Sequence, residues 1–532
     1  MVGQTSTKFP SSLLSPFSFI FATLLLTIPA ISQDVLTYHN NNARTGLDIQ
    51  ETKLTLSNVN SSTFGLLFKL PADGLVDAEP LYVSSVSVNG TTRNVVVVAT
   101  ENDSVYAYDA DTGAALWHVR ALKSGETPSD DRGCSQITPK IGISATPVIY
   151  RPTTGNPIVY LVAMSRDSSG NYHQRLHALD ITSGAELLGA PIDISAKYPG
   201  TGDNSSNGYV IFDPAQYKER AGLLMIGSTV YLAWASHCDI RPYTGFITGY
   251  NTSTLQQTTV LNVTPNGNGG AIWNSGAGMA ADSAGNIILL DANGVFDTNL
   301  NGSGFPSEGD YGNAFLRVTT AGGLAVADYF EMYNQESENN TDTDLGSGGA
   351  LLTTQKDLNG KTWQLAVGAG KDGNLYVVDR TNMGKFTANG NNIYQELDGV
   401  LPGGIWSMPA AGADRVFYGP QNAPIYEFQF KNAKLLNAPI AQTAVSFPYP
   451  GATPSLSANG GQNAIVWATA NTNPAVLYAF RASTLQMLYN SNQAAKGRDH
   501  FGNGNKFITP MIANGKVYIA SRTGVGVFGL LQ

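Results

Sequence analysis

One loop of the sequence has the residue types and the spacing of a calcium site. Asp297, Asn299 and Asn301 alternate, a glycine follows, and Glu308 occupies the place at which an EF-hand loop supplies two oxygens. Carboxylate and amide oxygens on alternate residues can surround Ca²⁺. Pro306 interrupts the second half of the loop and no helical pattern flanks it, which favours the alternative, an irregular solvated insertion. Both interpretations stay open.

A second set of residues has the side chains that a ligand site uses. Its members are polar or aromatic, and each lies near the start of a predicted strand: Glu79, Asn274, Asp344, Trp406 and Lys506. Lys371 and Asp499 occupy similar places. If the strand starts converge at one mouth of a channel, groups from distant parts of the chain can reach one small molecule or one partner loop. The alternative is that these residues are charged or polar groups on solvated loops. We assign no catalytic role to any of them.

The chain has two cysteines, Cys134 and Cys238, and both lie in long predicted loops. In an exported protein, two cysteines without a third most simply form one disulfide. Two unlinked buried thiols are the alternative, because the distance between the two Cα atoms cannot be read from the sequence.

Such groups need a rigid frame of secondary structure to position them. The sequence contains a repeated unit of short strands that can form this frame. Residues 78–82, 94–100 and 104–117 read as four short strands joined by tight turns, and residues 506–529 repeat that order with three strands. Looser copies lie between them. A four-stranded antiparallel unit of this kind is a propeller blade. The copies predict an all-β, eight-bladed β-propeller, and the strand at 65–70 is expected to complete the C-terminal blade.

Composition agrees with an all-β domain and excludes some functions. The 532 residues are 42% hydrophobic and 13% charged, with 57 glycines, which favours short strands and tight turns over long charged helices. The net charge of −9 argues against a nucleic-acid partner.

The N-terminus reads as a secretory signal. Lys8 precedes an apolar run, and Ala30 and Ser32 are the small residues that a cleavage before Gln33 requires. We therefore expect a signal peptide at 1–32, a single propeller domain at 33–532, and a secreted or periplasmic protein. A retained signal anchor is the alternative. No later stretch is apolar enough for a transmembrane span.

The repeats carry a further signature. A small or acidic residue followed by proline opens several units, as at Glu79-Pro80 and Thr453-Pro454, and the segment from Tyr106 to Trp117 reads YAYDADTGAALW. This resembles the PQQ-type propeller repeat of quinoprotein alcohol dehydrogenases, which also occurs in the lipoprotein scaffold of outer-membrane barrel assembly. The resemblance implies pyrroloquinoline quinone (PQQ) and calcium as cofactors of the catalytic members. The adjacent cysteine pair and the CxxCH haem motif of some members are absent from this sequence.

Long insertions gather on one expected face of the propeller: residues 123–142, 196–218, 237–244, 293–312, 331–346 and 492–505. Long loops in compact domains usually serve function, so we expect the ligand there. The favoured hypothesis is a binding or interaction propeller that holds a protein, a glycan or a small molecule without turnover. The alternative is a PQQ- and calcium-dependent dehydrogenase of alcohols or sugars that lacks the cysteine pair and haem. The sequence indicates neither the natural ligand nor the oligomeric state.

Overall fold

The computed structural model describes residues 1–6 and 33–532, and the described residues from 33 onward form one compact unit. The predicted apolar core of the signal peptide and its cleavage point before Gln33 therefore involve residues that lie outside the described ones. No helix in the described part of the chain combines the length and the apolar character that a membrane crossing needs.

The fold is a β-propeller, and its main sheets are antiparallel with the strands in sequence order. The first four sheets consist of β3 (Leu81–Val88), β4 (Thr91–Ala99), β5 (Ser104–Asp109) and β6 (Ala115–Arg120); β9 (Val148–Tyr150), β10 (Ile158–Arg166), β11 (Tyr172–Asp180) and β12 (Ile192–Asp193); β17 (Leu224–Ile226), β18 (Thr229–Ala235), β19 (Phe246–Asn251) and β20 (Gln257–Asn262); and β21 (Ala280–Ala281), β22 (Ile287–Leu290), β23 (Phe315–Thr319) and β24 (Ala325–Phe330).

The remaining main sheets follow the same order, except that β33 pairs with β31 and β2 with β40. They consist of β25 (Leu351–Lys356), β26 (Thr362–Ala369), β27 (Leu375–Asp379) and β28 (Gln395–Leu397); β29 (Ala410–Gly412), β30 (Arg415–Tyr418), β31 (Ala423–Lys431), β32 (Lys434–Leu435) and β33 (Ala441–Phe447); β34 (Ser455–Asn459), β35 (Gln462–Ala470), β36 (Val476–Arg481) and β37 (Met487–Asn490); and β38 (Met511–Ala513), β39 (Lys516–Ser521), β40 (Gly524–Leu530) and β2 (Phe64–Pro71). They match the repeat units that the sequence predicts.

Local sequence explains these strands. Residues 95–98 of β4 are four consecutive valines, all buried, and β-branched side chains favour a strand that is covered on both faces. Asn514 and Gly515 join β38 to β39 with φ of 53° and 78°, and two successive positive φ values form the tight hairpin turn that an Asn-Gly pair favours.

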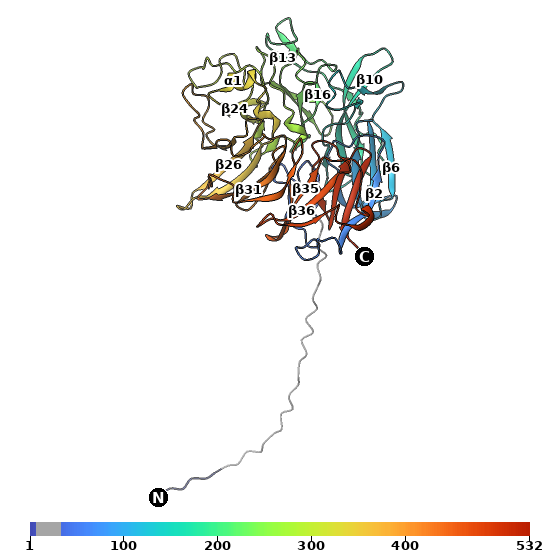
Figure 1. Cartoon of the computed structure of the whole chain (residues 1–532), viewed down its shortest axis with the longest axis vertical. Helices are drawn as coiled ribbons and strands as arrows, with labels where there is room; N and C mark the ends of the chain where they lie inside the picture. Colours follow the sequence, from blue (N-terminus) through green and yellow to red (C-terminus); the bar gives the residue numbers. More distant parts are fainter. Residues whose placement is uncertain (7–32) are drawn as a thin grey trace. The chain divides into compact units, whose positions relative to one another are not determined.

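The strand predicted at 65–70 is β2, and it pairs antiparallel with β40 from Phe64 opposite Leu530 to Pro71 opposite Gly524. Figure 1 shows this blue strand beside the red C-terminal strands. Phe64 packs its ring against Trp467, with 5.4 Å between the ring centroids. The predicted pairing of the two ends of the domain is therefore present.

Several insertions that the sequence predicts to be loops contain regular secondary structure. β7 (Thr127–Asp130) and β8 (Lys140–Ile141) extend the sheet of β10, and β16 (Lys218–Glu219) extends that of β18. A separate small sheet holds β13 (Lys197–Pro199), β14 (Ser205–Ser206) and β15 (Tyr209–Ile211), and α1 spans Gln335–Asn340. Short 3₁₀ turns are η1 (Asn274–Gly276), η2 (Leu345–Ser347) and η3 (Ala495–Gly497). In Figure 1, β13 and α1 lie at the same end of the sheets.

The segment of residues 35–51, which we call the strap, runs along the free edges of the first strands. Its hydrogen bonds join Val35 to Tyr82 on β3, Leu36 to Ile149 on β9, Asn42 to Met225 on β17 and Ala281 on β21, Ala43 to Leu352 on β25, Thr45 to Ala411 on β29, Gly46 to Leu456 on β34, and Glu51 to Gly515 beside β38. Within it, β1 (Leu47–Asp48) pairs parallel with β34. Because buried strand edges must find hydrogen-bond partners, one short segment ties all the main sheets together.

Arg44 anchors the strap. Its side chain is fully buried, and the guanidinium donates to the Met279 carbonyl at 2.8 Å, to Thr37 Oγ1 at 2.8 Å and to the Tyr38 carbonyl at 2.7 Å. Burial lowers the pKa of Arg44 to about 10, so the group is still charged at neutral pH. A single side chain thus joins two backbone carbonyls and one threonine hydroxyl.

We expect Arg44→Met to lower the free energy of unfolding by about 3 kcal/mol, because it leaves buried carbonyl groups without donors. The matched control is Arg481→Met, which changes a partly exposed arginine on β36 and should shift stability by less than about 0.5 kcal/mol. Urea unfolding followed by tryptophan fluorescence measures both. Equal effects of the two substitutions would contradict the anchoring role.

Glu79 lies under the strap. The side chain is buried, its Oε2 accepts the backbone N–H of His39 at 2.8 Å, and its own N–H donates to Thr146 Oγ1. Burial raises the pKa of Glu79 to about 8, against the opposing effects of the His39 hydrogen bond and the Arg44 charge. The carboxyl group is therefore protonated in the folded protein at neutral pH.

This protonation predicts a pH dependence. A carboxyl group ionises near pH 4.3 in the unfolded chain, so its stabilising contribution is complete below that pH and is lost as the pH rises through about 8. Glu79→Gln should make the slope of unfolding free energy against pH less negative between pH 5 and 7.5, by up to about 1.4 kcal/mol per pH unit. Urea titrations at several pH values measure the slopes, and parallel curves would show that Glu79 is ionised when folded.

Candidate functional site

A cavity of about 570 Å³ lies among the insertions and the connections between sheets. Its lining residues come from many parts of the chain: Cys134, Gln136, Ile137, Lys218, Arg220, Ala235, Ser236, Cys238, Asp239, Ala271, Trp273, Asp342, Thr343, Lys371, Trp406, Tyr449 and Phe507. This size suits a small molecule. The cavity lies on the face for which the long insertions predict a ligand.

Two cations on one wall make no ion pair with a described residue. Lys218 on β16 is 7% exposed, and its side-chain amine makes no hydrogen bond or ion pair with another described residue, although the carboxyls of Glu101 and Asp77 are close enough to act on its pKa. Arg220 is 3% exposed; its Nη1 donates to the Ser144 carbonyl at 3.2 Å, and its Nη2 is buried without a partner. Burial lowers the pKa of Lys218 to about 8, and the neighbouring Arg220 charge adds to this. Unpaired buried charges cost several kcal/mol, so an anion bound at this wall would be stabilised.

A buried ion pair stands beside the cavity. Lys371 Nζ lies 2.5 Å from Asp344 Oδ1 and 2.7 Å from Asp342 Oδ1, and Trp273 Nε1 donates to Asp344 Oδ2 at 3.0 Å. Burial raises the pKa of Asp344, although both Lys371 and the Trp273 hydrogen bond oppose the shift. Burial acts to lower the pKa of Lys371, but the carboxylates of Asp344 and Asp342 outweigh it and the pKa is raised. The cation and the Asp344 carboxylate therefore satisfy each other.

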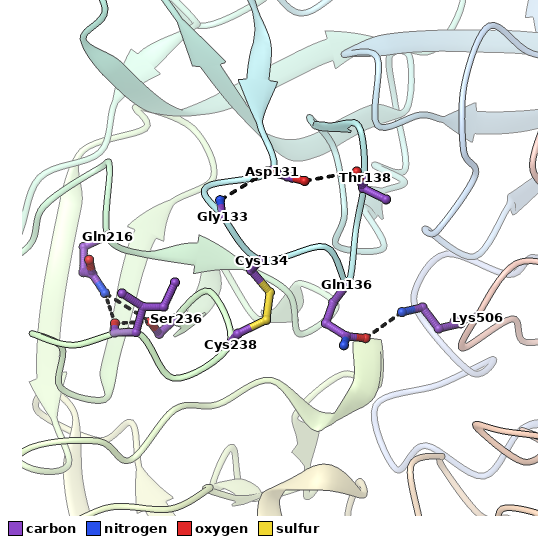
Figure 2. The surroundings of a disulfide bond; sticks show 10 residues. Asp131, Gly133, Cys134, Gln136, Thr138, Gln216, Ser236, Cys238 and Lys506 are labelled. Atoms are coloured by element: carbon purple, nitrogen blue, oxygen red, sulfur yellow. Dashed lines mark hydrogen bonds between the residues drawn. A yellow bond between two sulfur atoms is a disulfide. The ribbon is translucent and has the colours of Figure 1, made fainter.

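The predicted disulfide is present and forms part of the cavity wall. Cys134 and Cys238 are bonded, with 5.6 Å between their Cα atoms, across 104 residues of chain. Figure 2 shows the bond joining two loops, with Gln136 beside it accepting a hydrogen bond from Lys506 Nζ at 2.6 Å. The bond fixes two insertions from different sheets against each other.

Aromatic side chains supply the apolar part of the wall. Trp273 and Phe507 pack edge to face, with 6.4 Å between their centroids, and the Arg220 guanidinium lies 5.3 Å from the Phe507 ring centre. Trp406 and Tyr449 form a second pair at 6.0 Å. Flat apolar surfaces beside cations suit a ligand with a planar ring and carboxylate or phosphate groups.

The structure separates the predicted ligand residues into two groups. Trp406 lines the cavity, while Asp344 and Lys506 contact lining residues. Asn274 does not line it: the side chain is buried in η1 and donates to the carbonyls of Leu290 and Gly348. Glu79 does not line the cavity either, because its carboxyl group bonds the backbone of His39 in the strap.

Of the two further candidates, Lys371 lines the cavity, whereas Asp499 is buried away from it and accepts hydrogen bonds from Tyr489 and from the backbone of Leu66. Lys218, Arg220, Trp273 and Phe507 were not in the predicted set. The one available signal was the run of charges at 218–220, directly before an apolar strand.

The calcium-like loop forms turns that use its own side chains. Asp297 Oδ1 accepts the Asn299 N–H and its Oδ2 accepts the Glu308 N–H, while Asn301 Oδ1 accepts the N–H of Ser303. Within the described residues, no group of three or more His, Cys, Asp or Glu side chains is arranged to hold a metal ion. Calcium binding at this loop stays a prediction.

Neither a family model nor a curated protein matches the chain. Among solved structures, it is similar to the quinohemoprotein alcohol dehydrogenase from Comamonas testosteroni, at 14% identity over 94% of this chain and 80% of that one, with a TM-score of 0.58. A quinohemoprotein alcohol dehydrogenase from Pseudomonas putida HK5 shares 12% identity over 94% and 80% of the two chains, with a TM-score of 0.60. A europium-containing methanol dehydrogenase shares 12% identity over 92% and 90%, with a TM-score of 0.57. These likenesses show that the chain has the β-propeller fold of the quinoproteins.

The cavity residues fit a quinone with carboxylate groups better than they fit its metal. The unpartnered Nη2 of Arg220 and the unpaired Lys218 offer donors for carboxylates, and Trp273 offers a ring surface. For a divalent cation the nearby carboxylate is Asp344, whose oxygens are already taken by Lys371 and Trp273. Asp239, another carboxylate at the cavity, is exposed and accepts the Tyr243 hydroxyl.

We expect the double change Cys134→Ser and Cys238→Ser to lower the free energy of unfolding by about 2–4 kcal/mol, because a long loop of the unfolded chain is released. Urea unfolding measures this, and wild-type protein reduced with a phosphine should behave like the variant. Two thiols that are freely alkylated in native, unreduced protein would contradict the disulfide.

Proposed function

We propose that this protein is an exported β-propeller whose cavity binds a small anionic ligand with a planar ring, without turnover. One observation carries this: Lys218 and Arg220 face the cavity without a counter-ion, and Arg220 Nη2 has no partner. An anion would offset the cost of burying them, and the aromatic walls would accept its ring. Export is supported by the signal-like sequence before Gln33 and by the disulfide.

Ligand titrations test this proposal. PQQ and benzene-1,3,5-tricarboxylate serve as anionic probes and 1,3,5-trimethylbenzene as the uncharged one, with tryptophan fluorescence and calorimetry as readouts. We expect Arg220→Gln to weaken binding of the anionic probes tenfold or more, because a hydrogen bond between charged groups contributes about 1.5–3 kcal/mol. The matched control is Lys356→Gln, which removes an exposed charge on β25 outside the cavity. Equal affinities in both variants, or tighter binding of the uncharged probe, would reject an anion site at this wall.

The alternative of a quinone-dependent dehydrogenase is favoured by the shared fold and by one buried carboxylate beside the cavity. Bound PQQ would supply a two-electron acceptor. Lys218 and Arg220 would hold its carboxylates and Trp273 would contact its ring. Asp344, oriented by Trp273 and Lys371, is the group that could accept a substrate proton. A dye-linked assay on alcohols and sugars, with PQQ and CaCl₂ added, separates the two functions: turnover that Asp344→Asn removes supports the dehydrogenase, and PQQ binding without turnover supports the binding protein.

A further inference from the structure

The amine of Lys218 differs from the other lysine amines around the cavity. Lys371 is paired with two carboxylates, and Lys506 donates to Gln136. Lys218 lies on β16 with its stem buried and lines the cavity, and no described residue accepts a hydrogen bond from it. A free amine in a partly apolar cavity has the setting of a nucleophile.

The charges around Lys218 favour its neutral form. Burial is the main cause of its lowered pKa of about 8, Arg220 and Lys506 act in the same direction, and the carboxyls of Glu101 and Asp77 oppose them. The buried His237 ring follows β18 nearby, and burial together with the Lys218 charge lowers the pKa of His237 to about 3, so that ring is uncharged. At pH 7 about a tenth of Lys218 is therefore an unprotonated amine.

We propose that Lys218 captures the aldehyde or ketone group of an anionic ligand as an imine. This activity goes beyond reversible binding. It rests on the proposed function because the ligand must enter the same cavity. Arg220 would take a carboxylate of the ligand, and Trp273 and Phe507 would contact its ring. The ligand class is therefore a carbonyl compound that carries a carboxylate, such as an aromatic formyl acid.

The reaction is balanced without an oxidant or a reductant. The amine nitrogen attacks the carbonyl carbon, the C–N bond forms, and the π electron pair moves to the oxygen, which takes up the proton that the nitrogen loses. The C–O bond of this carbinolamine then breaks and water leaves. One amine and one carbonyl thus give one imine and one water.

Trapping with 4-formylbenzoate and sodium cyanoborohydride tests the proposal on the full chain from Gln33. Peptide mass spectrometry should locate the main adduct at Lys218, formed at least about tenfold faster at pH 7 than at Lys356, an exposed lysine outside the cavity. The rate at Lys218 should level off above about pH 8. Labelling of Lys218 no faster than of Lys356 would overturn the proposal.

Variants separate this inference from the binding function. Lys218→Arg keeps the charge but cannot form the imine, so it should lose the adduct while still binding 4-methylbenzoate, which has no carbonyl carbon to attack beside its carboxylate. Arg220→Gln removes the partner of the carboxylate and also a charge that lowers the pKa of Lys218. It should therefore slow trapping of both aldehydes, and that of 4-formylbenzoate several-fold more than that of benzaldehyde. If 4-methylbenzoate binds and Lys218 is not trapped, the imine proposal fails and the anion site stands. If benzaldehyde traps Lys218 while 4-methylbenzoate does not bind, the anion site fails and the nucleophile stands.

Discussion

The free edge of each first strand is the constraint on which this structure depends. A propeller sheet pairs its first strand on one side only, and a buried row of unpaired N–H and C=O groups is costly. The strap forms hydrogen bonds with the first strand of every main sheet or with a residue beside it. Arg44 holds the strap in place by donating to three acceptors. Gly46 shows how closely the segment packs: its φ is 64°, and a side-chain carbon there would lie 2.2 Å from His39 Nε2. The positions of the strand starts follow from this segment.

Those strand starts in turn determine the cavity. Lys218 lies on β16 and Trp273 in the connection between β20 and β21, and both line the cavity. The Cys134–Cys238 disulfide adds a covalent tie between two of the insertions there. Side chains that line a cavity on such a frame lose little further entropy when a ligand binds, which favours tight binding by few groups.

Much of the fold could be predicted from the sequence because its signals are local. Repeated strand-turn-strand units, Asn514-Gly515 and the unassigned strand at 65–70 lead directly to the sheets and to the pairing of β2 with β40. The strap could not be predicted, since its partners are spread along the whole chain and it has no periodic pattern. Trp406 could be predicted from its place at a strand start. Lys218 and Arg220 could not, because Lys218 lies in a short added strand and Arg220 directly follows it. Glu79 and Asn274 have polar side chains at strand starts, but they bond backbone groups instead of facing the cavity.

The two kinds of charge in the cavity are the reason for proposing binding before catalysis. Asp344 and Lys371 neutralise each other in the folded protein, so neither needs a ligand to offset its burial. Lys218 and Arg220 have no such partner, and the folded state carries their desolvation cost unless an anion arrives. A dehydrogenase would need Asp344 to be released from Lys371 before it could take a proton, which adds a step that binding does not require. The unpaired cations therefore favour a bound anion, whether or not a reaction follows binding. Imine formation at the Lys218 amine is one reaction that would leave the ion pair of Asp344 and Lys371 intact.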